Sequence, residues 1–307
     1  MPKPEHSCHN IGISAFGGKT NSSVAERFSA AAETYHRLAN IQRHVAAKLM
    51  DLLASAEPSA SRLGEARAAR RRLAKPGMPR RLAPSLILEV GCGTGLLTEM
   101  LLRTFPKASI EAVDISPAMT KKAYENLAGN KLVNLIVADA GKLTETKKYP
   151  LIVSNCVLHW IEPIQTIIQK LSALLEPDGT LAFAVMLRGT LVELNSARER
   201  IAPHKPPRVT LPDETDVRRA MNKANLKICG KKSETMRHEY FSAEKMLKQL
   251  HDQGLTGGNN LHGRNLLTRS ELSHLIADYS KNYKSKHGVY ASYHVFYCVA
   301  AKNKKTT

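Results

Sequence analysis

The sequence contains no long hydrophobic run. Of its 307 residues, 43% are hydrophobic, yet no apolar stretch reaches the roughly 18 residues that a membrane-spanning helix needs. The opening residues, MPKPEHSCHN, also lack the apolar core of a secretory signal peptide. We therefore expect a cytoplasmic protein that has no membrane partner.

Cysteine is scarce and widely spaced. The five cysteines stand at positions 8, 92, 156, 229 and 298, so neither a CxxC pair nor a zinc-ligand spacing occurs. This spacing is typical of buried thiols in a reducing compartment. The sequence therefore predicts no metal site.

Acidic residues are in the minority. There are 27 Asp and Glu against 45 Lys and Arg, which gives a formal net charge of +18. Such a surplus favours an anionic partner, which could be nucleic acid, a membrane surface or an acidic protein. Residues 60–81 concentrate the surplus, with eight cations and one acid. We interpret 56–84 as a basic linker or insertion, either a solvated segment or a docking site.

The rest of the chain divides by its periodicity. Residues 1–22 show none and are predicted to be a flexible tail. Over 23–55 apolar residues recur at helical spacing, which predicts an N-terminal helical segment of one helix or two consecutive ones. Residues 85–307 are predicted to form the main domain. Its late part carries helical cap elements at about 188–224 and 242–285.

Short apolar runs alternate with helical stretches from residue 86 onward. This alternation predicts a parallel sheet that is covered by helices on both faces. Further on, Thr268 to Glu271 reads T-R-S-E, which is a capping box for a late helix. The predicted strands are Leu86–Val90, Ser109–Val113, Asn134–Ala138, Leu151–Ser154, Thr180–Leu187, 225–232 and 293–301, and the predicted helices include 95–104, 117–127, 163–175, 213–224 and 242–252.

A glycine-rich turn follows the first predicted strand. Residues 86–97 read LILEVGCGTGLL, with glycines at 91, 93 and 95. Because position 96 is leucine, the stretch is not the G-x-G-x-x-G of dinucleotide folds, and it contains no GK[ST] phosphate loop. Glu89 ends the strand, where a carboxylate repels a pyrophosphate and suits a ligand with an ammonium group.

Two more acids stand at predicted strand ends. Asp114 ends the second strand and is placed to accept both hydroxyls of a ribose. Asp139, with Ala140, follows the third strand, where a carboxylate meets an adenine amine. Together with Glu89 they fit S-adenosylmethionine, which carries an amino-acid end, a ribose and an adenine but no phosphate. The alternatives are a simple chain turn at the glycines, a helix cap at Asp114 and a solvent-facing turn acid at Asp139.

The same stretch resembles the class I methyltransferases, whose E-x-G-x-G-x-G motif is matched by Glu89, Gly91, Gly93 and Gly95. The resemblance implies a Rossmann-like α/β fold with a mostly parallel seven-stranded sheet and an antiparallel C-terminal strand. It implies S-adenosyl-L-methionine as the cofactor. Its predicted contacts beyond the glycine motif are Asp114, Ser116, Asp139, Ala140 and Asn155.

The segment after the fourth predicted strand bears on the methyl acceptor. It reads Ser154-Asn155-Cys156-Val157 and lacks the proline pair that is typical of enzymes methylating base amines. This argues against nucleic acid as the substrate. A carboxylate acceptor is already ionised at neutral pH and needs no general base. His159 is the one candidate base nearby, and the alternative is a packed wall residue.

Three further segments resemble the malonyl-acyl-carrier-protein O-methyltransferases of biotin synthesis. They are RFSAAAETYHRLANIQRHVAAKLM (27–50), GTLVEL (189–194) and YHVFYCVA (293–300). The resemblance implies an O-methyltransferase that esterifies the free carboxylate of malonyl on acyl carrier protein, a small acidic partner. We expect a monomer.

The acceptor site rests on four candidate residues. Tyr35 either packs in the core or closes over the ligands. Thr190 and Glu193 have the spacing of a capping box, and the helix start is also a place for an acceptor. Arg188 either receives a carboxylate or is a surface charge. The four substrate-binding candidates are Tyr35, His159, Arg188 and Thr190.

Three other functions remain open from the sequence. The acceptor could be a small carboxylic acid or a quinone precursor. The charge surplus favours an RNA-binding methyltransferase, although the chain has few aromatics for stacking on bases. A third alternative is an assembly factor that binds the cofactor without transferring a methyl group.

Overall fold

The computed structural model describes residues 21–56, 84–205, 211–256 and 266–303. The predicted tail, up to residue 20, and residues 57–83 of the predicted basic insertion lie outside these ranges. Within them, no helix is both long enough and apolar enough to cross a membrane.

The N-terminal segment forms two consecutive helices, α1 (Asn21–Leu38) and α2 (Asn40–Ser55). They are separated at Ala39, whose backbone angles (φ −77°, ψ 49°) are not helical. One face of α2 is buried, because its apolar side chains recur every three or four residues. The buried residues of α2 are Ile41, Gln42, Val45, Ala46, Leu49 and Leu53.

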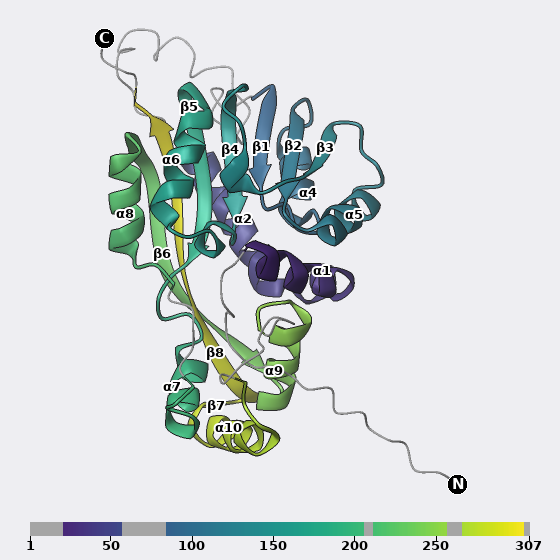
Figure 1. The fold of residues 1–307 in the computed structure, drawn as a ribbon. Helices are drawn as coiled ribbons and strands as arrows, with labels where there is room; N and C mark the ends of the chain where they lie inside the picture. The colour runs from purple at the N-terminus through teal and green to yellow at the C-terminus, as the bar shows by residue number, and fades with distance from the viewer. Residues whose placement is uncertain (1–20, 57–83, 206–210, 257–265, 304–307) are drawn as a thin grey trace. The chain divides into compact units, whose positions relative to one another are not determined.

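The strands form one sheet, in which most strands are parallel (Figure 1). Its main path runs in the order β3-β2-β1-β4-β5-β8-β6, and the short β7 pairs with β8. The first five strands in this order are parallel to one another, whereas β8 is antiparallel to β5. The strands are β1 (Leu86–Val90), β2 (Ser109–Asp114), β3 (Val133–Val137), β4 (Tyr149–Asn155), β5 (Leu175–Met186), β6 (Leu226–Tyr240), β7 (Lys284–Ser285) and β8 (Gly288–Lys302).

Helices cover both faces of the sheet. On one face α6 (Ile164–Leu174) and α8 (Glu214–Lys223) contact each other over a core of inward-facing side chains from β1, β4, β5 and β8. Alternate residues of these strands point to the other face, where α2 contacts α4 (Leu96–Thr104), β4 and β5. The remaining short elements are α5 (Pro117–Asn126), η1 (Ala140–Lys142) and η2 (Leu158–Trp160). This layering is the predicted Rossmann-like α/β fold.

Contacts within the chain define two compact units. The sheet unit comprises Ala39–Arg188, Leu211–Thr235 and His294–Thr307. The helical unit comprises Met1–Leu38, Gly189–Thr210 and Met236–Tyr293. It contains α1, α7 (Val192–Ile201), α9 (Ala243–Asp252) and α10 (Arg269–Asn282). Each of the two long strands β6 and β8 contributes one end to each unit.

The capping predictions had different outcomes. The box at α10 is confirmed, because the Thr268 hydroxyl accepts from the Glu271 amide (3.2 Å) and Glu271 Oε2 accepts from the Thr268 amide (2.6 Å). The box at Thr190 and Glu193 is wrong. Helix α7 begins after Leu191, which has φ 55°, and the Glu193 carboxylate instead accepts from the Ser292 amide (2.9 Å). Glu193 therefore binds Ser292, which is 99 positions away in the sequence, and does not cap its own helix.

Candidate cofactor and acceptor site

The glycine turn has a backbone that only glycine adopts easily. Gly91, Gly93 and Gly95 have φ of 75°, 53° and 90°. A Cβ on Gly91 would lie 2.1 Å from Cγ2 of Val157, so the two segments approach too closely for any side chain there. The Gly91 amide donates to the Val113 carbonyl (2.7 Å), which fastens the turn to β2. The chain thus passes tightly across the ends of β1 and β2.

Glu89 is buried directly beneath this turn. Its side chain is 1% exposed, and its Oε2 accepts from the Thr98 hydroxyl of α4 at 2.7 Å. Its other oxygen, Oε1, is buried without a hydrogen-bond partner among the described residues. Burial raises the pKa of this carboxyl to about 8; the Thr98 hydrogen bond opposes the rise, and the nearby charge of Asp114 contributes to it. A cation beside Oε1 would stabilise the ionised form.

Asp114 is held by backbone amides at the end of β2. Its Oδ2 accepts from the Gly93 amide (2.8 Å) and its Oδ1 from the Ser116 amide (2.9 Å). Burial raises the pKa of Asp114, and the two amide hydrogen bonds oppose that rise. Ser116 is itself buried, and its hydroxyl caps α5 by accepting from the Met119 amide. The side chain of Ser116 therefore has a structural role, and its cofactor contact stays a prediction.

Asp139 and Ala140 follow β3 as predicted. Asp139 Oδ1 accepts from the Gly141 amide at 2.9 Å and caps the short helix η1, which Ala140 begins. This is the turn role that was the alternative for Asp139. An adenine contact uses a further lone pair and stays a prediction.

Asn155 ends β4 and reaches across to α2. Its side-chain nitrogen, Nδ2, donates to the backbone carbonyl of Gln42 at 2.9 Å. The Gln42 side chain is 5% exposed, and its Oε1 is buried without a hydrogen-bond partner among the described residues. Sequence reasoning overlooked Gln42. The available signal was a polar residue in the stripe that continues with Val45 and Leu49.

Asp114, Glu89 and Asn155 lie side by side at the carboxyl ends of the adjacent strands β2, β1 and β4. Ligands of open α/β sheets bind at the carboxyl ends of the strands, and these three residues stand there. Residues 89–98 contain no Lys or Arg, so this turn offers no side-chain cation to a phosphate. Two carboxylates and one carboxamide, with no cationic side chain in the turn, suit a neutral or cationic nucleoside ligand.

Two of the acceptor candidates belong to the sheet unit. His159 is 3% exposed, its Nδ1 accepts from the Met186 amide at 3.4 Å, and its ring lies 5.3 Å from that of Trp160. Arg188 is exposed and pairs with Asp213 at 3.2 Å. His159 is thus a buried, packed residue, and Arg188 forms a surface ion pair.

The other two acceptor candidates belong to the helical unit. Tyr35 is half-buried on α1, where its ring meets that of Phe28 edge-on at 6.1 Å. Thr190 is buried directly before α7. Their contact with an acceptor remains a prediction.

Several relatives of this chain are named methyltransferases. A family model described as a methyltransferase domain matches residues 88–181. A malonyl-acyl-carrier protein O-methyltransferase of Hahella chejuensis is 30% identical over 297 residues, which cover 93% of this chain and 92% of the relative. The corresponding enzyme 2 of Ilyobacter polytropus is 28% identical over 280 residues, covering 91% and 97%.

A solved structure agrees with the fold. The crystal structure of a Bacillus halodurans C-125 protein superposes on this chain with a TM-score of 0.55 at 13% identity. It covers 84% of this chain and 99% of that chain. The class I methyltransferase fold expected from the sequence is confirmed.

Proposed function

We propose, because this chain belongs to the malonyl-acyl-carrier protein O-methyltransferases, that it esterifies the free carboxylate of malonyl-acyl carrier protein with a methyl group from S-adenosylmethionine. The product carries no charge at that end, so fatty-acid enzymes can elongate it in biotin synthesis. The family membership assigns the reaction class, and the residues of the sheet edge support the choice of donor.

One observation carries the choice of donor. Glu89 keeps a buried, unpaired oxygen beneath a turn that has no cationic side chain, and Asp114 stands on the neighbouring strand. This set fits a nucleoside with an ammonium group and without phosphate. Glu89 would hold the amino-acid end, Asp114 the ribose, and Asp139 with Ala140 the adenine. When bound, S-adenosylmethionine supplies an activated methyl group on sulfur.

The proposed reaction needs no general acid or base. The malonyl carboxylate is ionised at neutral pH, so it could take the methyl group directly, with the electron pair of the carbon–sulfur bond left on sulfur. No residue would have to remove a proton. His159 is therefore assigned to excluding water with its neighbour Trp160, since both are buried. Alignment of the two substrates provides the rate enhancement.

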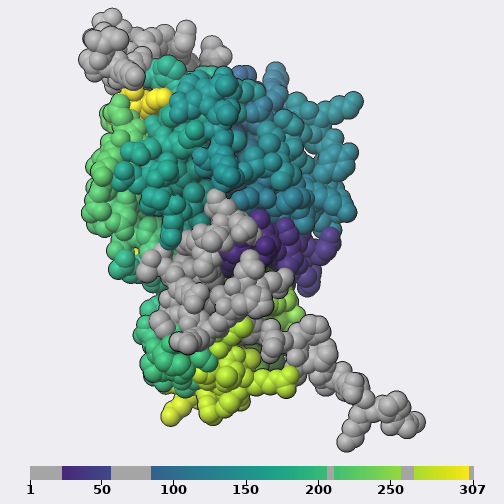
Figure 2. Space-filling model, in the orientation of Figure 1, coloured from purple at the N-terminus to yellow at the C-terminus, as the bar shows by residue number. Residues whose placement is uncertain are grey.

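The acidic carrier partner fits a cationic surface on the helical unit. The cationic hairpin comprises Lys281, Lys284 and Lys286, all exposed, at the end of α10, in β7 and in the turn before β8. Within the described residues none of the three forms an ion pair. Atoms of α10 form part of the molecular surface in Figure 2.

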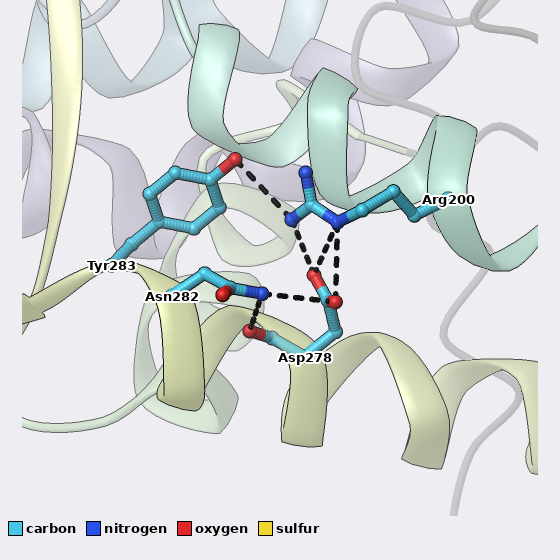
Figure 3. Close-up of polar contacts among 4 residues, drawn as sticks. All are labelled: Arg200, Asp278, Asn282 and Tyr283. Atoms are coloured by element: carbon cyan, nitrogen blue, oxygen red, sulfur yellow. Dashed lines mark hydrogen bonds and ion pairs between the residues drawn. The ribbon is translucent and has the colours of Figure 1, made fainter.

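The acid of this segment is already neutralised. Asp278 is the only acidic residue between Leu272 and Tyr293. Its carboxylate accepts from Arg200 Nη2 (2.5 Å) and from Asn282 Nδ2 (3.0 Å), while the same Arg200 nitrogen reaches the Tyr283 hydroxyl at 3.3 Å (Figure 3). Arg200 holds the pKa of Asp278 below its usual range. Asp278 is thus paired with Arg200, and the lysines leave the hairpin with a net positive charge.

A methyl-transfer assay with a radiolabelled donor tests the function. We expect label in a base-labile ester on malonyl-acyl carrier protein, with slower transfer to malonyl-coenzyme A and little to free malonate. Label in a small carboxylic acid, a quinone precursor or RNA would overturn the proposed acceptor. Donor binding without turnover on any of these acceptors would favour an assembly factor.

A further inference from the structure

Two buried side-chain oxygens in the sheet unit lack hydrogen-bond partners among the described residues: Oε1 of Glu89 and Oε1 of Gln42. Their side chains are 1% and 5% exposed. A buried acceptor without a donor is costly, and native proteins seldom tolerate one without a functional reason. Two such atoms in one unit indicate that a donor arrives with a ligand.

A hydrogen bond and the packing of α2 place both residues on the same face of the sheet. Glu89 points toward the layer of α4, because the Thr98 hydroxyl of that helix donates to its other oxygen. Gln42 belongs to the buried face of α2, which contacts α4 and β4. Both residues therefore lie in the layer that α2 and α4 form.

Both residues also lie toward the same end of the strands. The Ser154 hydroxyl of β4 donates to the carbonyl of Val90, the residue after Glu89 (2.9 Å). The next residue of β4, Asn155, donates to the Gln42 carbonyl. Gln42 is thus tied to the carboxyl end of β4, directly beside the end of the strand that carries Glu89.

We infer that Gln42 is a ligand-binding residue whose side-chain oxygen, together with Oε1 of Glu89, accepts hydrogen bonds from the ammonium group of the methyl donor. A primary ammonium has three N–H donors, which is enough for both oxygens and one further acceptor. The carboxamide gives Gln42 an acceptor without a second negative charge next to Glu89. The inference depends on S-adenosylmethionine as the donor but not on the identity of the methyl acceptor.

Ligand pairs that differ in the amino-acid end test this assignment. S-adenosylhomocysteine keeps the amino-acid end, whereas 5′-methylthioadenosine has the adenine and ribose without it. Gln42→Met removes the acceptor at nearly constant volume. We expect its affinity for S-adenosylmethionine and S-adenosylhomocysteine, measured by calorimetry, to fall about tenfold or more. Its affinity for 5′-methylthioadenosine should stay within about twofold of the parent value.

A second variant separates an ammonium contact from a carboxylate contact. Gln42→Glu keeps an acceptor oxygen and adds negative charge. We expect it to bind S-adenosylhomocysteine as well as the parent protein or better, because an ammonium is attracted to the added charge. A large loss with Gln42→Glu, at unchanged affinity for 5′-methylthioadenosine, would place Gln42 at the carboxylate end and overturn the inference.

Thermal unfolding gives a readout that a merely structural role would not produce. Without ligand, Gln42→Met should keep or raise the melting temperature, because it removes an unpaired buried acceptor. The stabilisation by added S-adenosylhomocysteine should shrink. Gln253→Met is the matched control: this buried glutamine of the helical unit donates to the Leu38 carbonyl. It should lower the melting temperature and leave ligand affinity unchanged.

The outcomes distinguish this inference from the proposed function. If the parent protein binds neither S-adenosylmethionine nor S-adenosylhomocysteine, the proposed function fails. If the parent binds them and Gln42→Met binds all three ligands equally well, the assignment of Gln42 alone is wrong. Equal losses for all three ligands would show a packing role and would also overturn it.

Discussion

The Gly93 amide donates a 2.8 Å hydrogen bond to Oδ2 of Asp114, which joins the glycine turn to the end of the neighbouring strand. The Ser116 amide holds the other carboxylate oxygen at 2.9 Å. Each oxygen keeps a further lone pair for a ligand. The carboxylate is thus oriented by the backbone before any ligand binds, which lowers the entropic cost of binding.

Replacing Asp114 should weaken every adenosine ligand. Asp114→Asn removes the charge and turns an NH₂ group toward one of the two amides that the carboxylate accepts from. We expect the affinities for S-adenosylmethionine and for 5′-methylthioadenosine to fall by the same factor, about tenfold or more, since both ligands contain the ribose. Calorimetry checks this. Unchanged affinity for 5′-methylthioadenosine would remove Asp114 from the ribose site.

The pH dependence of binding should report the ionisation of Glu89. Its pKa is raised to about 8, so below that pH the ligand-free protein carries it protonated. Because an ammonium binds the carboxylate form, binding between about pH 6 and pH 7.5 should release a proton and tighten as the pH rises. Calorimetry in buffers of different ionisation enthalpy measures the proton. Glu89→Gln should abolish the release; a parent protein that releases none would contradict the assignment.

Glu89 should also affect stability, with a definite sign. The folded pKa of about 8 lies above the usual 4.5, so between these values the unfolded chain binds fewer protons than the folded one. The free energy of unfolding of the unliganded protein should therefore fall as the pH rises through this window. Denaturant titrations of Glu89→Gln, in which this contribution is missing, should show a smaller fall. Parallel curves for both proteins would contradict the raised pKa.

The sequence predicted the parts of the fold that local patterns determine. The strand from Leu86 to Val90 has the predicted ends, because an apolar run is followed at once by glycines that cannot continue it. Helix α5 begins at Pro117, and the T-R-S-E box marks the start of α10. In each case the residues that decide the boundary are neighbours in the chain.

The errors come from distant partners. The T-x-x-E spacing at Thr190 predicted a cap, but the acceptor oxygens of Glu193 are taken by Ser292 on β8. Strand β6 continues to Tyr240, well past the predicted end at 232, although its second half shows little apolar alternation. Gln42 escaped notice because its neighbour Asn155 is 113 positions away.

The close approach of Gly91 and Val157 should be visible in a double-mutant cycle. Gly91→Ala places a Cβ 2.1 Å from Val157 Cγ2 at a φ of 75°, so we expect a loss of about 2–5 kcal/mol in the free energy of unfolding. Val157→Ala removes both γ-carbons and should recover part of it. Denaturant unfolding measures the coupling. Gly141→Ala, whose Cβ would have 3.3 Å to its nearest neighbour, is the control. Additive effects of the two changes would contradict the clash.

The cationic hairpin should control encounter with the carrier protein. Lys284→Glu with Lys286→Glu reverses two exposed charges, so we expect kcat/KM for malonyl-acyl carrier protein at low salt to fall about tenfold. The value for a small malonyl thioester that carries no phosphate should change little. Raising the salt from 0.1 M to 1 M shortens the Debye length from about 10 Å to about 3 Å, and it should bring the parent and the variant together.

A matched charge change elsewhere decides whether the hairpin or the overall charge matters. Lys107→Glu with Lys131→Glu alters the net charge equally at two exposed positions of the sheet unit. If the hairpin docks the carrier, this control should lose far less activity than the hairpin variant at low salt. Salt ions screen the attraction between the enzyme and the carrier beyond about one Debye length, so only charges near the docking site matter. Equal losses for the two pairs would show that only the net charge of +18 steers the carrier, and the hairpin would then have no docking role.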